Sequence, residues 1–122
     1  MARVMIIDGT LEHVRVLVKE LKSNGHETMG FLRGDKALEA HLEFKPDLVI
    51  CEWRLADKMK GWEVAHQLGK IEHRPYMVAL HQFPSRLKTA ISFEFGFNEC
   101  ATKPLKVFTL LTWAARAIKR AQ

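Results

Sequence analysis

Cysteine, long apolar runs and low-complexity stretches are scarce or absent in this sequence, and each absence excludes a class of protein. The two cysteines, Cys51 and Cys100, both have apolar neighbours, so we expect reduced thiols rather than a disulfide-stapled scaffold. No apolar run approaches the roughly 20 residues of a membrane-spanning helix. Met1 is followed by a strand-like segment instead of the apolar core of a signal peptide. We therefore expect a soluble, cytoplasmic protein with no membrane partner.

An excess of acid is also missing, because the net charge is +5. Residues 1–99 hold 14 basic and 14 acidic residues, so the whole excess lies in residues 100–122, which contain five basic residues and no acid. Cations near the C-terminus of a helix interact favourably with the helix dipole, and a solvated helix end explains the excess. We therefore do not expect direct binding to nucleic acid.

The sequence does contain a regular alternation of two periodicities over its 122 residues. Short apolar segments typical of strands cover residues 3–8, 26–31, 47–52, 75–81 and 97–102. Segments with helical spacing of apolar residues follow them and cover residues 11–21, 35–44, 62–68, 85–95 and 107–118, with Thr10, Asp35 and Ser85 as the expected N-caps. The alternation predicts one domain over residues 1–122 with an α/β fold, a doubly wound, five-stranded parallel sheet with helices on both faces.

The residues that close the strands are the first candidates for a functional site, because open parallel sheets bind ligands outside the carboxyl ends of their strands. These residues are Asp8, Glu52, His81 and, after the fifth strand, Lys103. A single glutamate at the end of a buried strand is often only a polar residue where the strand leaves the core. With Asp8 and Lys103 expected at the same crevice, a functional role for Glu52 is the better interpretation.

Four short motifs resemble those of the receiver domain of bacterial two-component response regulators. They are IID at 6–8, PDLVICE at 46–52, GWE at 61–63 and GFNECATKP at 96–104. The resemblance covers essentially the whole chain in order, and it implies the flavodoxin-like (βα)5 fold of CheY-like receivers. In this family a phosphoryl group passes from a histidine kinase to an aspartate at the end of the third strand.

The resemblance implies a role for each strand-end residue. Glu52 stands at the position of the phosphoaccepting aspartate, and Asp8 and Gly9 stand where the family has a pair of acids that hold Mg²⁺. His81 replaces the serine or threonine that grips the phosphoryl group, whereas Lys103 matches the lysine of the family. The chain therefore resembles a degenerate receiver, in which only Asp8 and Lys103 match outright.

The departures from the family pattern affect each part of the phosphorylation chemistry. Gly9 provides no oxygen ligand for Mg²⁺, and the extra methylene of Glu52 moves the carboxylate by about 1.5 Å, a large shift for in-line phosphoryl transfer. His81 offers no hydroxyl, and Cys100 occupies a switch position usually held by Tyr or Phe. The vestigial Mg²⁺ site would comprise Asp8, Glu52 and the backbone of Arg54. We expect no bound metal or other cofactor.

Two functions compete under this resemblance. The first is a phosphorylation-independent pseudo-receiver, not an enzyme, that acts by protein–protein interaction. Glu52, paired with Lys103 or Arg54, would then supply a permanent and weaker version of the phosphoryl charge. The alternative is a working phosphoacceptor, which a histidine kinase phosphorylates in the presence of Mg²⁺ and which catalyses its own phosphoryl transfer and hydrolysis. The missing acid and the changed acceptor favour the pseudo-receiver.

A flavodoxin-like small-molecule binder is a more remote class, because GTLEHV at 9–14 lacks the glycine spacing of a phosphate-binding loop.

The last helix carries the expected interaction surface, since receivers usually signal through their fourth helix, fifth strand and fifth helix. The expected buried stripe of the last helix consists of Leu110, Leu111, Ala114 and Ile118. Trp113 lies outside this stripe, so we expect it to be exposed and to anchor an interface. The other candidate interface residues are Phe108, Ile91, Lys106 and Arg116. The partner would be a histidine kinase or a downstream regulator, or a second copy bound through the last helix.

Overall fold

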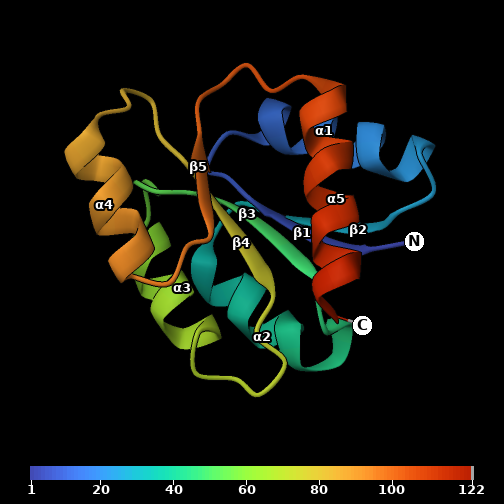
Figure 1. The fold of residues 1–122 in the computed structure, drawn as a ribbon, viewed down its shortest axis with the longest axis horizontal. Coiled ribbons are helices and arrows are strands. Elements are labelled where there is room, and N and C mark those ends of the chain that lie inside the picture. The colour runs from blue at the N-terminus through green and yellow to red at the C-terminus, as the bar shows by residue number, and fades with distance from the viewer. Residues whose placement is uncertain (122) are drawn as a thin grey trace.

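The computed structural model describes residues 1–121 and contains a single five-stranded sheet. The strands are β1 (Arg3–Ile7), β2 (Glu27–Phe31), β3 (Leu48–Glu52), β4 (Tyr76–Leu80) and β5 (Glu99–Ala101). All neighbouring strands are parallel, and their order is β2-β1-β3-β4-β5 (Figure 1). The chain leaves β1 toward one edge of the sheet and then returns past it to β3. The carboxyl ends of β1 and β3 therefore flank the point where the winding of the sheet reverses.

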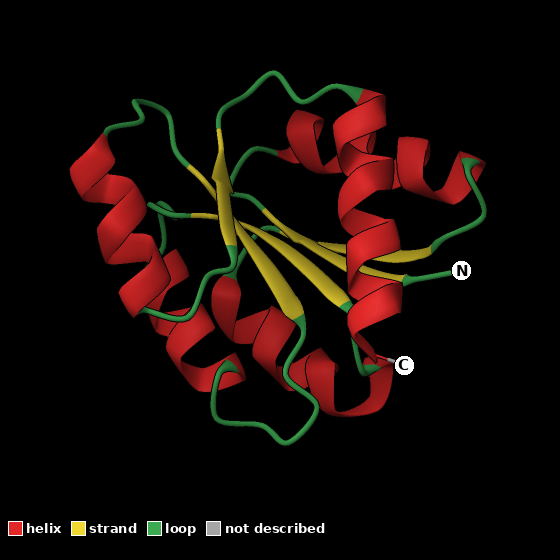
Figure 2. Ribbon diagram, in the orientation of Figure 1, coloured by secondary structure: helices red, strands yellow, loops and turns green. Residues whose placement is uncertain are grey.

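Helices cover both faces of this sheet (Figure 2). They are α1 (Leu11–Ser23), α2 (Gly34–Phe44), α3 (Gly61–Leu68), α4 (Arg86–Glu94) and α5 (Val107–Ala121). One core cluster joins α1 and α5 to one face of the sheet, and a second joins α2 and α3 to the other face. The predicted doubly wound α/β fold is thus confirmed. Within residues 1–121, no helix is long and apolar enough to cross a membrane.

Alternate residues of the central strands point into the two clusters. In β1, Val4 and Ile6 belong to the cluster under α1 and α5, whereas Met5 and Ile7 belong to the cluster under α2 and α3. A strand that is buried on both faces has no polar alternation, which explains its uninterrupted apolar sequence. The first polar residue after such a strand lies where the strand ends. Asp8, which follows Ile7, therefore lies at the carboxyl ends of the strands.

The predicted helix starts agree with the structure at two of the three expected N-caps. Thr10 and Ser85 are N-caps, and the Ser85 hydroxyl accepts a hydrogen bond of 3.1 Å from the backbone N–H of Lys88. The third prediction is wrong, because α2 starts at Gly34 and Asp35 lies inside its first turn. A carboxylate in the first turn of a helix is favoured by the helix dipole, so Asp35 has a stabilising position without being the cap.

The expected exposure of Trp113 is wrong. Its side chain is 1% exposed and packs in the core with Leu110, Ala114 and Ala117. These four residues follow the spacing i, i+3, i+4, i+7, so the buried stripe is rotated toward Trp113 relative to the expected one. Trp113 therefore cannot anchor an interface in this fold, whereas Phe108, at 80% exposure, is on the surface.

Candidate functional site

Three of the predicted strand-end residues meet at the carboxyl edge of the sheet. Asp8 directly follows β1, Glu52 closes β3, and Lys103 lies in the loop between β5 and α5. The Nζ of Lys103 is 3.0 Å from Oε2 of Glu52 and also forms an ion pair with Oδ2 of Asp8. The predicted convergence of the three residues is confirmed, and the partner of Glu52 is Lys103 rather than Arg54.

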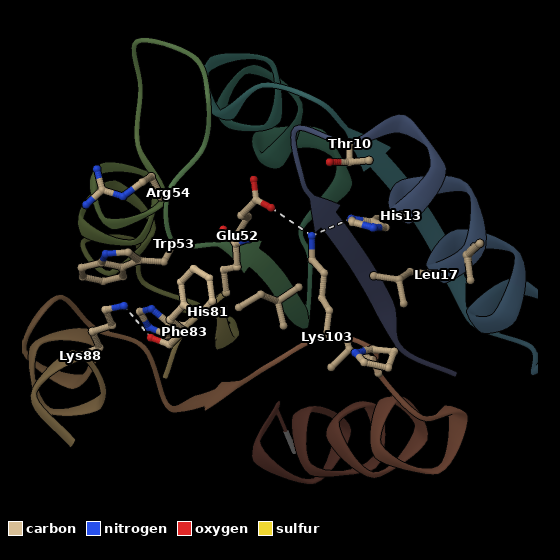
Figure 3. Close-up of a pocket in the computed structure, with 15 residues that line it drawn as sticks. Thr10, His13, Leu17, Glu52, Trp53, Arg54, His81, Phe83, Lys88 and Lys103 are labelled. Carbon is tan, nitrogen blue, oxygen red and sulfur yellow. Dashed lines mark hydrogen bonds and ion pairs between the residues drawn. The ribbon is translucent and has the colours of Figure 1, made fainter. Parts of the chain in front are cut away.

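A residue that the sequence did not single out completes this cluster. His13 lies in the first turn of α1, and its Nδ1 is 2.7 Å from Nζ of Lys103, on the side opposite Glu52 (Figure 3). A lysine ammonium has three N–H donors and no acceptor. Nδ1 of His13 must therefore carry a lone pair and accept. The ammonium thus donates hydrogen bonds to Glu52 and His13 and forms an ion pair with Asp8.

Burial and the two carboxylates act in opposite directions on the ammonium. Burial lowers the pKa of Lys103, but hydrogen bonds and ion pairs with Asp8 and Glu52 outweigh it, so the pKa is raised. Asp8 is fully buried and its other oxygen, Oδ1, accepts a 2.9 Å hydrogen bond from the backbone N–H of Thr10. The site is therefore a group of two carboxylates paired with one lysine cation.

Comparison with known proteins identifies the family of this chain. The family model described as the response regulator receiver domain matches residues 4–115. The chain belongs to the response regulator receiver domain family. It is thus a domain of two-component signalling systems, whose members interact with signalling proteins such as kinases or effectors.

Solved receiver structures have the same fold at low sequence identity. The receiver domain of the Francisella response regulator 1452 is 18% identical, with a TM-score of 0.89 over 100% of both chains. A receiver domain protein from Clostridium thermocellum is 20% identical, with a TM-score of 0.88 over 98% of this chain and 96% of that one. NtrX from Brucella abortus, solved in complex with ATP, is 21% identical with a TM-score of 0.88, and the match covers 98% of this chain but 27% of NtrX.

The side chains of this receiver do not fit the Mg²⁺ site of the family. Within residues 1–121, no group of three or more His, Cys, Asp or Glu side chains is arranged to hold a metal ion. A Cβ atom built on Gly9 would lie 3.6 Å from Oε1 of Glu52, so the position has room for a side chain but contributes no oxygen. Asp8 and Glu52 both face the ammonium of Lys103 instead of an open position. The exposed side chain of Arg54 lies over the ring of Trp62, 5.8 Å from its centre.

His81, which replaces the hydroxyl residue of the family, ties β4 to α4. The buried imidazole Nε2 lies 2.8 Å from the hydroxyl oxygen of Ser92, and that hydroxyl donates to the carbonyl of Lys88. Ser92 must therefore accept from an Nε2–H of His81. Burial lowers the pKa of His81, and the charge of Lys88 lowers it further. The imidazole is thus a buried group that joins β4 to α4 through a hydrogen bond.

The two cysteines are free thiols. Cys51 is buried within β3, and burial raises its pKa, with further contributions from Glu52 and Asp8. Cys100, at the switch position, is half-buried in β5 and packs against the cluster under α2 and α3. The structure thus agrees with the absence of disulfide bonds.

A cavity of about 750 Å³ lies over the strand ends, between α1 and the loop from β4 to α4 (Figure 3). Its lining includes His13, Val16, Trp53, Phe83 and Lys88 around Glu52 and Lys103. The cluster of Lys103 is therefore accessible from this side, although the ammonium donors are already directed to the protein.

Proposed function

We propose that this receiver domain is a pseudo-receiver, which acts in two-component signalling through protein–protein interaction and without phosphorylation of Glu52. The observation that carries the proposal is the arrangement around Lys103. In the family this lysine neutralises the phosphoryl group. Here the ammonium donates hydrogen bonds to Glu52 and His13 and pairs with Asp8, so an incoming phosphoryl group would have to displace an existing partner.

Glu52 in this proposal is a fixed charge rather than a nucleophile. Its carboxylate already pairs with Lys103 at 3.0 Å, which gives one permanent negative charge where phosphorylation would add about two. Gly9 and His81 supply neither the second acid nor the hydroxyl that the family uses. We accordingly propose that the domain has no enzymatic activity and uses no Mg²⁺ or other cofactor.

The proposed partner is a signalling protein of the same pathway, a histidine kinase or a downstream regulator, in the cytoplasm. The exposed ring of Phe108 and the exposed basic residues Lys106 and Arg116 are the remaining candidates on and beside α5, since Trp113 is buried. A basic rim of this kind would mainly accelerate association with an acidic partner.

Treatment with small phosphodonors tests this proposal. The domain would be incubated with acetyl phosphate and Mg²⁺, or with beryllofluoride and Mg²⁺, and followed by intact mass and amide chemical shifts. We expect no covalent phosphate and no shifts centred on Asp8, Glu52 and Lys103. A stoichiometric, acid-labile adduct that Glu52→Gln abolishes would overturn the proposal in favour of a working phosphoacceptor.

A further inference from the structure

Helix α4 is the least buried helix of the domain. Of its nine residues, only Ser92 is buried. Its outward side carries Leu87, which is 70% exposed, and Phe93, which is 51% exposed, and Phe83 just before the helix is 69% exposed. Figure 1 shows α4 at the margin of the molecule, well separated from α5. Neighbouring exposed apolar side chains of this kind mark an interaction surface.

The outward side of α4 is symmetric about Ala90. Leu87 and Phe93 lie three residues before and after Ala90, and Arg86 and Glu94 lie four residues before and after it. With about 3.6 residues per turn, positions three and four residues away share one face of a helix. Ala90 is exposed at the centre of this face, opposite the buried Ser92. The face is thus apolar near its centre and carries opposite charges at its two ends.

The charges of Arg86 and Glu94 both interact unfavourably with the dipole of α4. Arg86 is the first residue of α4 and Glu94 is the last, whereas the dipole favours acids at the start of a helix and bases at its end. Within residues 1–121, neither side chain forms an ion pair. In the isolated domain, each charge therefore has an unfavourable position and no compensating partner.

We propose that α4 binds α4 of a second copy of this chain, antiparallel, about a two-fold axis at Ala90. In such a pair, a residue that follows Ala90 by a given number of positions lies level with the partner's residue that precedes Ala90 by the same number. Leu87 is then level with the partner's Phe93, and Arg86 with the partner's Glu94, each pairing occurring twice by symmetry. The same arrangement brings each helix start beside the partner's helix end, so the dipoles attract as well.

A hollow on the surface of α4 supports this occupant. It is lined by Pro84, Ser85, Arg86, Thr89, Ala90 and Phe93. In the proposed pair, the partner's Phe93 lies on the same flank of the two helices as Phe93 of the first copy. Along the helix axis, however, the partner's Phe93 is level with Leu87. The partner's ring then lies over the hollow, between Arg86 and Thr89. The small side chain of Ala90 permits the close approach that this insertion needs.

The pair is expected to be weak. A nine-residue helix is only about 13 Å long, and a contact of this length falls at the low end of the size range of specific interfaces. Association should therefore be visible as a concentration-dependent monomer–dimer equilibrium. The proposal does not depend on whether Glu52 accepts phosphate, because no residue of the Lys103 cluster lies in the interface.

Charge exchange at the two helix ends tests the arrangement by sedimentation over a wide concentration range. The wild-type domain should dimerise, and Arg86→Glu and Glu94→Arg should each weaken dimerisation by about tenfold or more, because each substitution opposes like charges at two places. Both substitutions agree with the helix dipole, so neither should lower the melting temperature. Lys119→Glu changes the same charge on the exposed side of α5 and serves as the matched control, with association expected to be unchanged.

An equimolar mixture of the two variants is the decisive sample. In a mixed dimer, the acid introduced at position 86 faces the base introduced at position 94, and the native Arg86 and Glu94 of the two chains face each other. Association should therefore recover to about the wild-type level. The proposal would be overturned if the wild-type domain stayed monomeric at all concentrations, or if the charge variants dimerised like the wild type. It would also be overturned if association of the mixture failed to recover, which would indicate a different partner surface.

Discussion

Lys103 is the residue on which the stability of the strand-end cluster should depend most. Lys103→Met keeps the length of the side chain but leaves Asp8 and Glu52 without their cation. An exposed pair contributes about 1 kcal/mol or less, and breaking a buried pair costs about 3–5 kcal/mol. Because Asp8 is fully buried and the Lys103 side chain is 27% exposed, the loss should lie between these limits. We expect about 2 kcal/mol at neutral pH, measured by urea unfolding.

The contribution of Lys103 to the free energy of unfolding should depend on pH in one direction. Folding raises the pKa of Lys103 above its ordinary value of 10.5, so its contribution is complete below that pH and is lost as the pH rises through the higher folded value. The gap between wild type and Lys103→Met should therefore be constant near neutrality and close only in strongly alkaline solution. Lys36→Met, at an exposed surface pair, is the control with little effect. Equal stability of wild type and Lys103→Met at pH 7 would show that the cluster contributes nothing.

A second prediction at the residue scale concerns the hydrogen bond between His81 and Ser92. Ser92→Ala leaves a buried imidazole N–H without an acceptor, which should cost about 1–3 kcal/mol in urea unfolding.

The lowered pKa of His81 means that the folded state binds fewer protons than the unfolded state below about pH 6.5, so stability should fall as the pH falls through that value.

His81→Gln separates the hydrogen bond from the titration. An amide can still donate to Ser92 but does not gain a proton, so the acid-side loss of stability should be smaller than in the wild type. It should not vanish, because burial and the N-terminal charge also lower the pKa of His26. If the wild type and His81→Gln show the same pH dependence between pH 5 and pH 7.5, the imidazole is not the titrating group.

At the scale of the element, α5 presents two faces whose roles can be separated by substitution. Trp113→Ala removes a buried indole and should cost about 3–5 kcal/mol. Phe108→Ala acts on an exposed ring and should change stability by about 0.5 kcal/mol or less. Unfolding and sedimentation of both variants measure this. A Trp113→Ala variant that keeps wild-type stability but loses association would restore the interface role that the buried position argues against.

The error about Trp113 has a specific physical origin. The sequence of α5 contains two overlapping apolar stripes, one with Leu111 and Ile118 and one with Trp113 and Ala117, and both share Leu110 and Ala114. Helical spacing allows either stripe to face the sheet. The angle at which α5 packs on the sheet selects the one with Trp113 and leaves Leu111 and Ile118 half-buried at its margins. Periodicity alone does not contain that angle.

At the scale of the whole molecule, topology explains which site residues could be predicted. Asp8 and Lys103 follow strands and Glu52 ends one, and parallel strands end at one edge of the sheet, so their convergence follows from the alternation of elements. His13 lies on a helix among other polar residues of the first two turns. Only the packing of α1 directs it toward Lys103, although its position in the first turn of the helix that follows Asp8 was an available signal.

Phosphorylation should be restored by replacing three side chains, since the parallel sheet holds its strand ends in the positions used by the family. The triple variant Gly9→Asp, Glu52→Asp, His81→Thr supplies the second acid, the shorter acceptor and the hydroxyl. A Cβ at position 9 meets nothing closer than 3.6 Å, so that change is sterically permitted. With acetyl phosphate and Mg²⁺, we expect an acid-labile phosphoryl adduct on residue 52 of the triple variant by intact mass and peptide mapping.

The control is the double variant Gly9→Asp, His81→Thr, which retains Glu52 and should remain unmodified, because the extra methylene displaces the nucleophile by about 1.5 Å. His81→Thr also removes the bond to Ser92, so circular dichroism must show that both variants are folded. A folded triple variant without an adduct would contradict the prediction. The block would then lie in the remaining partners of Lys103, and His13→Ala in the triple background would test it, because that change frees one ammonium donor for the phosphoryl group.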